Sequence, residues 1–479
     1  MQVLFVASEC APLVKTGGLA DVVSALPKAL AAQGVAARVM LPGYPAATAA
    51  LAGGRETDAG FVSAGGPVRL VAGSAAGLDL IAVDAPHLFD RPGSPYLGPD
   101  GRDWTDNHLR YGALCRAAAA VARDGLDGWR PELVHVHDWQ AGLVPAYLKL
   151  TAGAAPPVVA TIHNIAFQGL FPAGVLDALE LPWAGFTAEG FEFYGHVGFL
   201  KAGLAYADRI TTVSPTYARE LMTADFGLGL EGLVAARRAD VAGILNGVDL
   251  EVWDPETDAQ IAAPYSIRRL RPKAVNRAAV ERRLALDPDP SRPLFCVISR
   301  LTRQKGLDLL LDCMPRLLAR GARLAVLGAG DADLEAGFRA AAAANPGRIA
   351  AVIGYDEPLS HLLQAGADAI VIPSRFEPCG LTQLYGLRYG TLPVVARTGG
   401  LADTVIDANE AALADGVATG FQFAPVTAPA LADAIDRACD LFADAPRWTA
   451  AVRRAMRQDV GWSVSAARYA ALYRELVGR

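Results

Sequence analysis

The chain of 479 residues lacks the sequence features of secreted and membrane-spanning proteins. Its six cysteines are scattered, with no C-x-x-C pair, which predicts free thiols in a reducing compartment. No apolar run approaches the roughly 18 residues of a membrane span. A strand-like segment begins at the first residues, without a basic leader or a cleavage site. We therefore expect a soluble, cytoplasmic protein.

Positive charge is also scarce. The 44 Lys and Arg residues are outnumbered by 50 Asp and Glu residues, which gives a net charge of −6. This balance argues against a general binder of nucleic acid or membrane surfaces, so an anionic ligand would need a local basic cluster. The length and the 52% hydrophobic content nevertheless support large cores in two or three domains.

One nine-residue pattern occurs near each end of the chain. Lys15-Thr-Gly-Gly-Leu-Ala-Asp-Val-Val23 returns as Arg397-Thr-Gly-Gly-Leu-Ala-Asp-Thr-Val405, with seven of the nine positions identical. Each copy follows a short apolar run and opens an amphipathic segment, as in a strand, a glycine-rich turn and a helix start. Backbone N–H groups at such a turn can bind an anion. The repeat predicts two similar lobes that face one cleft.

Strand-like and helix-like segments alternate through both halves, which predicts an α/β fold with parallel sheets covered on both faces. We expect helices at 107–123, 139–150 and 197–207, and strands at 37–41, 68–72, 80–83, 133–137, 158–162, 209–213, 294–299, 323–327, 349–353, 369–372 and 392–396.

The alternation lapses between about residue 244 and residue 294, which suggests a domain boundary there. We expect a first lobe at 1–243, a second lobe at 244–456 and a C-terminal segment at 457–479. The final helix, over 463–477, either caps the second lobe or crosses back to the first.

A basic cluster follows one apolar strand of the second half, in Ser299-Arg300-Leu-Thr-Arg303-Gln-Lys305-Gly306. Cations at the carboxyl end of a strand, before a helix, suit a phosphate group. The alternative is a solvated turn, which we disfavour because of the placement before a helix.

A second candidate site lies in Arg375-Phe-Glu377-Pro-Cys379-Gly-Leu-Thr382. It stands between an apolar strand and a helix, so the amides of Gly380, Leu381 and Thr382 would point at a phosphate. We expect Glu377 to accept hydrogen bonds from sugar hydroxyls, and a helix-capping glutamate is the alternative.

Three histidines lie at the ends of neighbouring strands in the first half: His135, His137 and His163. A metal site at His135 and His137 is possible from their shared strand face, but no further Cys or His cluster supports it. We therefore expect no metal. The G-x-G at Gly328 and Gly330 lacks the third glycine of a dinucleotide fingerprint, so we reject an NAD site.

Together these motifs resemble those of the bacterial glycogen synthases and plant starch synthases, and the match covers essentially the whole chain. The motifs that carry it are Lys15-Thr-Gly-Gly-Leu-Ala-Asp21, Asp90-Arg-Pro-Gly-Ser-Pro-Tyr96, His135-Val-His-Asp-Trp139, Thr161-Ile-His-Asn164, Asn246-Gly-Val-Asp249, Ser299-Arg-Leu-Thr-Arg-Gln-Lys-Gly306 and Ser374-Arg-Phe-Glu-Pro-Cys-Gly-Leu381. The resemblance implies a GT-B fold, with two Rossmann-like lobes around a central cleft and a C-terminal helix that returns to the first lobe. It also implies transfer of glucose from ADP-glucose to the non-reducing 4-OH of an α-1,4-glucan, with retention of configuration and without a cofactor or metal.

The resemblance assigns roles residue by residue. Lys15 and the amide of Gly18 would face the donor diphosphate from the first lobe, with Arg300, Lys305 and the amides from Cys379 to Thr382 on the second. Tyr355 would stack on adenine, and Asp138, His163, Asn246 and Glu377 would surround the glucosyl unit. Many members of the wider retaining clan carry a second Glu eight residues after the first. Here that position is Tyr385, so ribose binding by a second carboxylate is not carried over.

For the acceptor, the polar loop from Asp90 to Asn107 presents two aromatic residues, Tyr96 and Trp104, whose faces suit glucose rings. The alternative is that one or both rings hold the loop to its own lobe. Two other functions stay open from the sequence. One is a non-catalytic glucan-binding regulator of the same fold, and the other is a phosphorylase-like enzyme that uses pyridoxal phosphate.

Overall fold

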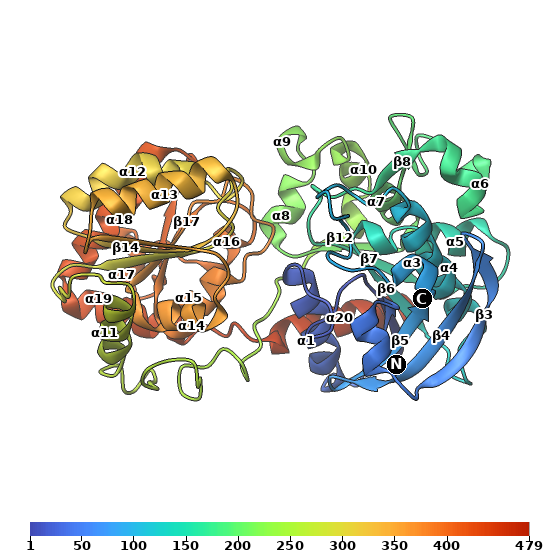
Figure 1. Cartoon of the computed structure of the whole chain (residues 1–479), viewed down its shortest axis with the longest axis horizontal. Coiled ribbons are helices and arrows are strands. Elements are labelled where there is room, and N and C mark those ends of the chain that lie inside the picture. Colours follow the sequence, from blue (N-terminus) through green and yellow to red (C-terminus); the bar gives the residue numbers. More distant parts are fainter. Residues whose placement is uncertain (479) are drawn as a thin grey trace. The chain divides into compact units, whose positions relative to one another are not determined.

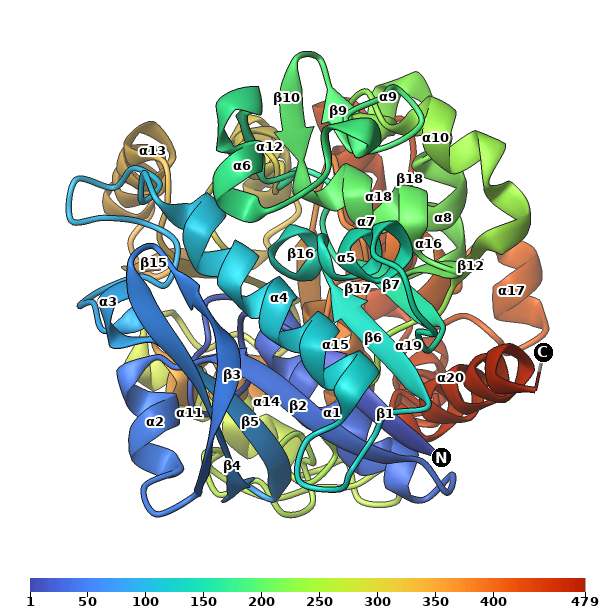
Figure 2. The same cartoon turned by 90° about the vertical axis from the view of Figure 1, so that its right-hand side faces the viewer.

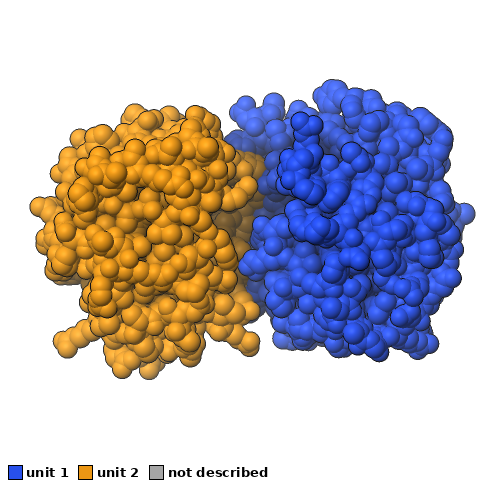
Figure 3. Space-filling model, in the orientation of Figure 1, with its two compact units in different colours: residues 1–246, 462–479 blue, residues 247–461 orange. Residues whose placement is uncertain are grey.

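The computed structural model describes residues 1–478, which form two compact units. The first unit contains Met1–Asn246 and the segment from Trp462 onward, and the second contains Gly247–Gly461 (Figure 3). The chain therefore leaves the first unit after Asn246 and returns to it at Trp462. These crossings lie a few residues beyond the expected boundaries at 243 and 456.

A nine-stranded sheet forms the centre of the first unit, in the order β12-β11-β7-β6-β1-β2-β5-β4-β3 (Figure 2). The strands from β12 to β5 pair in parallel, and their buried apolar runs fit a sheet that is covered on both faces. The bounds are β1 Gln2–Val6, β2 Ala36–Pro42, β3 Arg55–Ser63, β4 Gly66–Ala75, β5 Leu78–Asp84, β6 Leu133–His137, β7 Val158–Ile162, β11 Arg209–Thr212 and β12 Val241–Gly243.

The edge of this sheet differs from the expectation of parallel pairing throughout. β4 pairs antiparallel with β5 and with β3, so the sheet is mixed. β3 carries Arg55, Glu56 and Asp58, and its residues alternate between exposed and partly buried. A charged strand with one solvated face is typical of a protected sheet edge. It lacks the apolar run that predicts most of the other strands.

Helices cover both faces of the nine-stranded sheet. α4 lies across one face in Figure 2 and contacts β1, β2, β3 and β5. The helices of this unit are α1 Gly18–Ala31, α2 Pro45–Ala50, α3 Pro86–Phe89, α4 Asn107–Asp124, α5 Val144–Leu150, α6 Leu176–Leu179, α7 Phe199–Tyr206, α8 Pro215–Glu220, α9 Ala224–Gly227, α10 Glu231–Ala236 and α20 Trp462–Val477. The helix expected at 139–150 is interrupted at Gly142 and Leu143, and residues 196–198 belong to a strand.

The C-terminal helix α20 belongs to the first unit. Its apolar face packs with α1 and β1 in one hydrophobic core. The hydroxyl of Tyr473 lies 2.7 Å from Nδ1 of the buried His135 on β6, and Arg209 on β11 forms an ion pair with Glu475. The capping alternative for this helix is therefore excluded.

A small antiparallel sheet, β8-β10-β9, follows β7 in the chain. Its strands are β8 Leu170–Pro172, β9 Glu192–Phe193 and β10 His196–Gly198.

The second unit is built on a six-stranded parallel sheet in the order β15-β14-β13-β16-β17-β18 (Figure 1). Its strands are β13 Leu294–Ile298, β14 Arg323–Gly328, β15 Ile349–Ile353, β16 Ala369–Ile372, β17 Leu392–Ala396 and β18 Phe421–Phe423. Its helices are α11 Lys273–Arg283, α12 Leu307–Ala319, α13 Ala332–Ala344, α14 Glu357–Gly366, α15 Thr382–Tyr389, α16 Gly399–Thr404, α17 Glu410–Ala414, α18 Ala428–Ala443 and α19 Ala445–Met456. The predicted class, two α/β lobes with a C-terminal helix that returns to the first, is confirmed.

Candidate active site

In each unit the predicted site residues gather at the carboxyl ends of parallel strands. Ligands of open α/β sheets bind at this edge, because helix N-termini and loops meet there. In the first unit, Lys15 follows β1, Asp138 follows β6 and His163 follows β7. In the second unit, Arg300 and Lys305 follow β13, Tyr355 follows β15 and Glu377 follows β16.

The turn after β1 is organised by Glu9, a residue that no sequence motif indicated as functional. Glu9 is buried, and its carboxylate accepts hydrogen bonds from the amide and the hydroxyl of Thr16, both at 2.5 Å. The amide of Gly17 donates to the same carboxylate at 3.3 Å. Glu9 thereby fixes the backbone of the turn that leads into α1. Lys15 is exposed, and its Nζ lies 2.8 Å from Asp21 Oδ1.

The loop that carries Tyr96 is attached to the same carboxylate. The Tyr96 hydroxyl donates to Glu9 Oε1 and lies 2.8 Å from the Ser8 hydroxyl. Burial holds the pKa of the Tyr96 phenol well above its usual range, and the negative charge of Glu9 adds to this effect. Trp104 supports the loop, because its amide donates to Tyr96 and the Arg91 guanidinium lies 4.7 Å from its ring centroid.

Asp138 and His163 lie together at the ends of β6 and β7. The His163 amide donates to Asp138 Oδ1 at 2.7 Å, which ties the two strand ends to each other. Desolvation raises the pKa of the Asp138 carboxyl to about 7, although the amides of His163 and Asn164 oppose the shift. Burial lowers the pKa of the His163 imidazole to about 3, so this side chain is neutral at physiological pH.

Both histidines of β6 form hydrogen bonds inside the unit, but the buried Nε2 of His137 has no hydrogen-bond partner among the described residues. His135 Nε2 lies 2.5 Å from the Thr161 hydroxyl, and His137 Nδ1 lies 2.9 Å from His163 Nε2. Within residues 1–478 no group of His, Cys, Asp and Glu side chains has the arrangement of a metal site.

The amide oxygen of Asn246 is buried and has no hydrogen-bond partner among the described residues, so it can accept a bond from a ligand.

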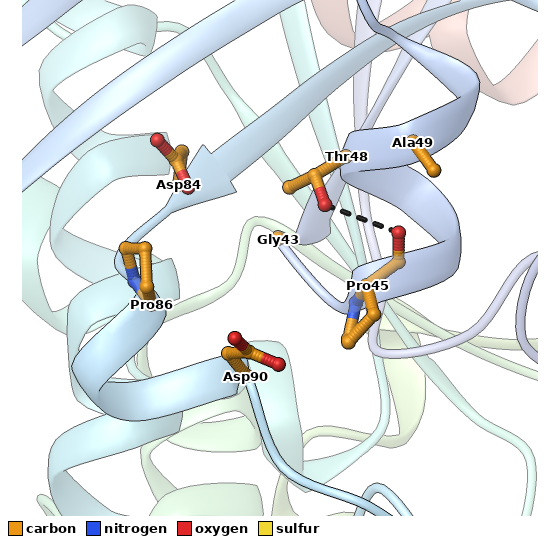
Figure 4. A pocket seen from close by; sticks show the side chains of 7 residues that line it. All are labelled: Gly43, Pro45, Thr48, Ala49, Asp84, Pro86 and Asp90. Atoms are coloured by element: carbon orange, nitrogen blue, oxygen red, sulfur yellow. Dashed lines mark hydrogen bonds between the residues drawn. The ribbon is translucent and has the colours of Figure 1, made fainter.

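A pocket of about 370 Å³ opens at the carboxyl ends of β2 and β5. Figure 4 shows that two carboxylates, Asp84 and Asp90, line it opposite the first turn of α2, where Pro45, Thr48 and Ala49 supply the other wall. Asp84 is also paired with Arg69 at 2.6 Å. Carboxylate oxygens beside small apolar surfaces suit a ligand with hydroxyl groups.

In the second unit, Lys305 and Glu377 come together because β13 and β16 are neighbours. Lys305 Nζ lies 2.5 Å from Glu377 Oε2, and the Ser374 hydroxyl donates to the same oxygen at 2.9 Å. Glu377 is buried, whereas Arg300 is exposed. Gly306 permits this arrangement, because a Cβ there would lie 1.9 Å from the carbonyl oxygen of Pro373.

The second copy of the glycine pattern has a different task from the first. The Gly400 amide donates to the Glu377 carbonyl at 3.1 Å, and a Cβ on Gly399 would lie 2.0 Å from that oxygen. The glycines thus let α16 pack against the loop that holds Glu377. Our expectation that this turn also presents its amides to an anion is wrong for Gly400, because its amide already donates to the carbonyls of the loop that holds Glu377.

The loop from Cys379 to Thr382 leads into α15, which begins at Thr382 without a side-chain cap. The first amide groups of such a helix point out of its N-terminus and favour an anion. Gly380 adopts a φ of +71° in this turn, and Leu381 and Cys379 flank it. Gln383 Nε2 donates to the carbonyls of Cys379 and Gly380, both at 2.9 Å, and so fixes the loop.

Two tyrosines of the second unit differ sharply in their surroundings. Tyr355 is 83% exposed beyond the end of β15, and its hydroxyl donates to Glu357 at 2.8 Å. Tyr385 stacks on Trp253, with ring centroids 3.7 Å apart. The position that carries a second Glu in the wider clan therefore holds a side chain that packs inside the second unit.

Comparison with known proteins fits this arrangement. Residues 2–236 match the model of the starch synthase catalytic domain, and residues 281–454 match that of the glycosyl transferases group 1. The chain is similar to the solved catalytic domain of starch synthase IV from Arabidopsis thaliana, bound to ADP and acarbose, with a TM-score of 0.87 and 30% identity over 100% of this chain and 99% of that one. Sucrose-phosphate synthase from Thermosynechococcus elongatus shares the fold, with a TM-score of 0.60 at 19% identity over 100% and 99% of the two chains. The fold and the site thus define a glycosyltransferase of the GT-B type.

The curated relatives give the narrower group. The chain is 62% identical to a glycogen synthase from Roseobacter denitrificans and 54% identical to one from Acidiphilium cryptum, in both cases over 100% of each chain. It therefore belongs to the glycogen synthase family.

Proposed function

We propose that this protein elongates α-1,4-glucan chains by transferring glucose from ADP-glucose to the non-reducing 4-OH, with retention of the anomeric configuration. The observation that carries the proposal is the pairing of Lys305 with the buried Glu377 beside the N-terminus of α15. It offers a cation and orphan amides to a phosphate next to a carboxylate that accepts sugar hydroxyls. The membership of the family supports the same conclusion.

We assign the donor diphosphate to Arg300, Lys305 and the amides from Gly380 to Thr382 on the second unit, and to Lys15 and the Gly18 amide on the first. Breaking the glucosyl–phosphate bond leaves negative charge on ADP, and fixed cations stabilise that charge as it develops. The ADP in the Arabidopsis starch synthase IV structure supports a nucleotide diphosphate as the leaving group. Tyr355 is exposed and offers its ring to the adenine.

We assign the glucosyl unit to Asp138, His163, Asn246 and Glu377. These groups orient the sugar, because an imidazole, an amide and two carboxylates can form hydrogen bonds with its hydroxyls. The His163 imidazole does so in its neutral form. In this proposal no side chain attacks the anomeric carbon. The departing phosphate accepts the proton of the acceptor hydroxyl on the same face, and the new glycosidic bond forms as the phosphate bond breaks.

The acceptor side of the proposal is Tyr96, whose position is fixed by Glu9. Trp104 keeps its role as a neighbour that supports the loop, since Arg91 covers one face of its ring.

We also propose a cytoplasmic location. It is supported by the six cysteines, all of them free and buried. No helix within the described residues is long and apolar enough to cross a membrane.

The test is incorporation of labelled glucose into glycogen from ADP-glucose and from UDP-glucose, with a chelator present. We expect incorporation from ADP-glucose that survives the chelator. No incorporation from either donor would refute the proposal and favour the non-catalytic glucan-binding regulator, whereas an absorbance band of bound pyridoxal phosphate would favour the phosphorylase-like enzyme.

A further inference from the structure

His137, the last residue of β6, is a buried ionisable residue to which the proposed function assigns no task. Its strand pairs in parallel with β7, and His163 follows the end of β7. His137 Nδ1 therefore lies 2.9 Å from His163 Nε2, and the two ring centroids are 5.2 Å apart. The His137 ring also packs against the rings of Phe5 and His135. One ring nitrogen of His137 thus bonds the imidazole of a residue that we assign to the glucosyl unit.

The hydrogen bond between these two rings contains a single proton. Burial lowers the pKa of both imidazoles, to about 3 for His163, so both rings are neutral at physiological pH. Each neutral ring carries one N–H group and one bare nitrogen. If His163 Nε2 carried the shared proton, the proton of His137 would have to lie on its own Nε2.

The surroundings of His137 Nε2 disfavour that arrangement. This nitrogen is buried and has no hydrogen-bond partner among the described residues. Buried N–H groups without a partner are rare in folded proteins, because desolvation of the donor is not compensated. The proton of His137 is therefore expected on Nδ1, which donates to His163 Nε2.

This direction of donation determines what His163 can offer to a ligand. Because its Nε2 accepts a bond from His137, the neutral His163 ring carries its own proton on Nδ1. No described residue forms a hydrogen bond with that nitrogen, and His163 is partly exposed. The buried amide oxygen of Asn246, also assigned to the glucosyl unit, can only accept. An N–H donor on His163 complements that acceptor.

We propose that His137 is a positioning residue, which fixes His163 in the tautomer with its proton on Nδ1 and so makes His163 a hydrogen-bond donor to an oxygen of the glucosyl unit. This inference rests on the proposed function, which assigns His163 to the sugar. His137 acts through His163 alone, because its own ring is buried. A sugar hydroxyl both donates and accepts, so the tautomer of His163 decides how that hydroxyl is oriented for its other partners.

Nitrogen NMR of the full chain labelled with [¹⁵N]histidine reads the tautomer directly. Protonated and bare nitrogens of a neutral imidazole differ strongly in chemical shift, and the chain contains seven histidines. The His163→Gln variant identifies the signals of His163 by their loss. We expect a proton on Nδ1 of His163 and none on Nε2 at neutral pH. A proton on Nε2 in the wild type would overturn the inference, whether or not any variant of His137 folds.

Two variants test whether His137 sets this tautomer. His137→Leu fills the space without a donor, so the His163 signals should shift toward a proton on Nε2. The kcat/KM for ADP-glucose should then fall roughly ten- to a hundredfold, because the sugar is held less well in its reactive position. His137→Asn keeps an N–H group near the place of Nδ1 and should hold kcat/KM within about threefold of the wild type.

Tyr473→Phe is the matched control. It removes the hydrogen bond between Tyr473 and His135 in the same core, so it should lower Tm without changing the His163 signals or kcat/KM. A loss of kcat/KM equal to that of His137→Leu would overturn the inference, because core stability would then account for both.

The His137 variants offer two further ways to overturn the inference. One is a His137→Leu protein in which either the tautomer of His163 or kcat/KM is unchanged. The other is an equal loss of kcat/KM in His137→Leu and His137→Asn, because the donor would then contribute nothing. Failure of the proposed function has a different signature. The wild type would then transfer no glucose, while its spectrum would still show where the His163 proton lies.

Discussion

The pairing of Lys305 with Glu377 makes the effect of removing each donor-binding cation separable. In Lys305→Ala, the buried Glu377 carboxylate keeps only the Ser374 hydroxyl as a side-chain partner in this cluster. A buried charged group that loses a hydrogen-bonding partner lowers the free energy of unfolding by about 1–3 kcal/mol. We place the loss near 2 kcal/mol because Lys305 is partly exposed. The rate should fall roughly 10²- to 10³-fold, since one stabilising contact to the departing ADP is gone.

Arg300→Ala is the matched comparison. Arg300 is exposed, so its removal should change the unfolding free energy by less than about 0.5 kcal/mol while lowering kcat to a similar degree. In the double variant Lys305→Met with Glu377→Gln, the uncompensated charge is absent, and stability should return while activity stays low. Urea unfolding and initial rates with saturating ADP-glucose measure both effects. Near-wild-type kcat in both single variants would refute the assignment of these cations to the diphosphate.

Three further predictions concern the first unit. Glu9→Gln should raise KM for ADP-glucose several-fold, because a neutral amide binds the Thr16 amide and hydroxyl less tightly; an unchanged donor KM would contradict this. Tyr96→Ala should raise KM for maltooligosaccharides well above the effect of Tyr96→Phe, and equal effects would mean that the ring contributes nothing. The depressed pKa of His163 means that the unfolded chain binds a proton below pH 6.5 that the folded chain binds only near pH 3. Stability from this group is thus complete above pH 6.5 and lost on acidification, so between pH 7.5 and 5 His163→Gln should lose roughly 2 kcal/mol less than the wild type in urea unfolding.

Most of the parallel strands could be predicted from the sequence because each is a short apolar run followed by a polar or glycine-rich turn, whereas the three-residue strands β12 and β18 were not predicted. Strand β3 and helix α11 could not be placed by this signal, because β3 is rich in charged and small residues and α11 carries several arginines. Contacts between residues that are distant in the sequence could not be predicted either. The partners of Tyr385 and Gly400 are distant in sequence, at Trp253 and Glu377.

The proximity of Lys305 and Glu377 could be predicted, because each lies in the loop that follows a strand and β13 and β16 are neighbours in the sheet. Glu9 also follows a strand directly, yet a single glutamate gives no sign that it will accept bonds from Thr16, Gly17 and Tyr96. The only available clue was its place between the first strand and the glycine-rich turn. Burial of Asp138 and His163, which sets their pKa values, likewise depends on the folded unit and not on the local sequence.

The most direct test of the central claim is to locate the transferred glucose in the product. Glycogen labelled by this protein from ADP-[¹⁴C]glucose is digested with β-amylase, which removes maltose from the non-reducing ends of α-1,4 chains. We expect the label to be released as maltose, because each new glucose is joined by an α-1,4 bond at a chain end. Label that resists β-amylase, or that is never incorporated, would contradict it.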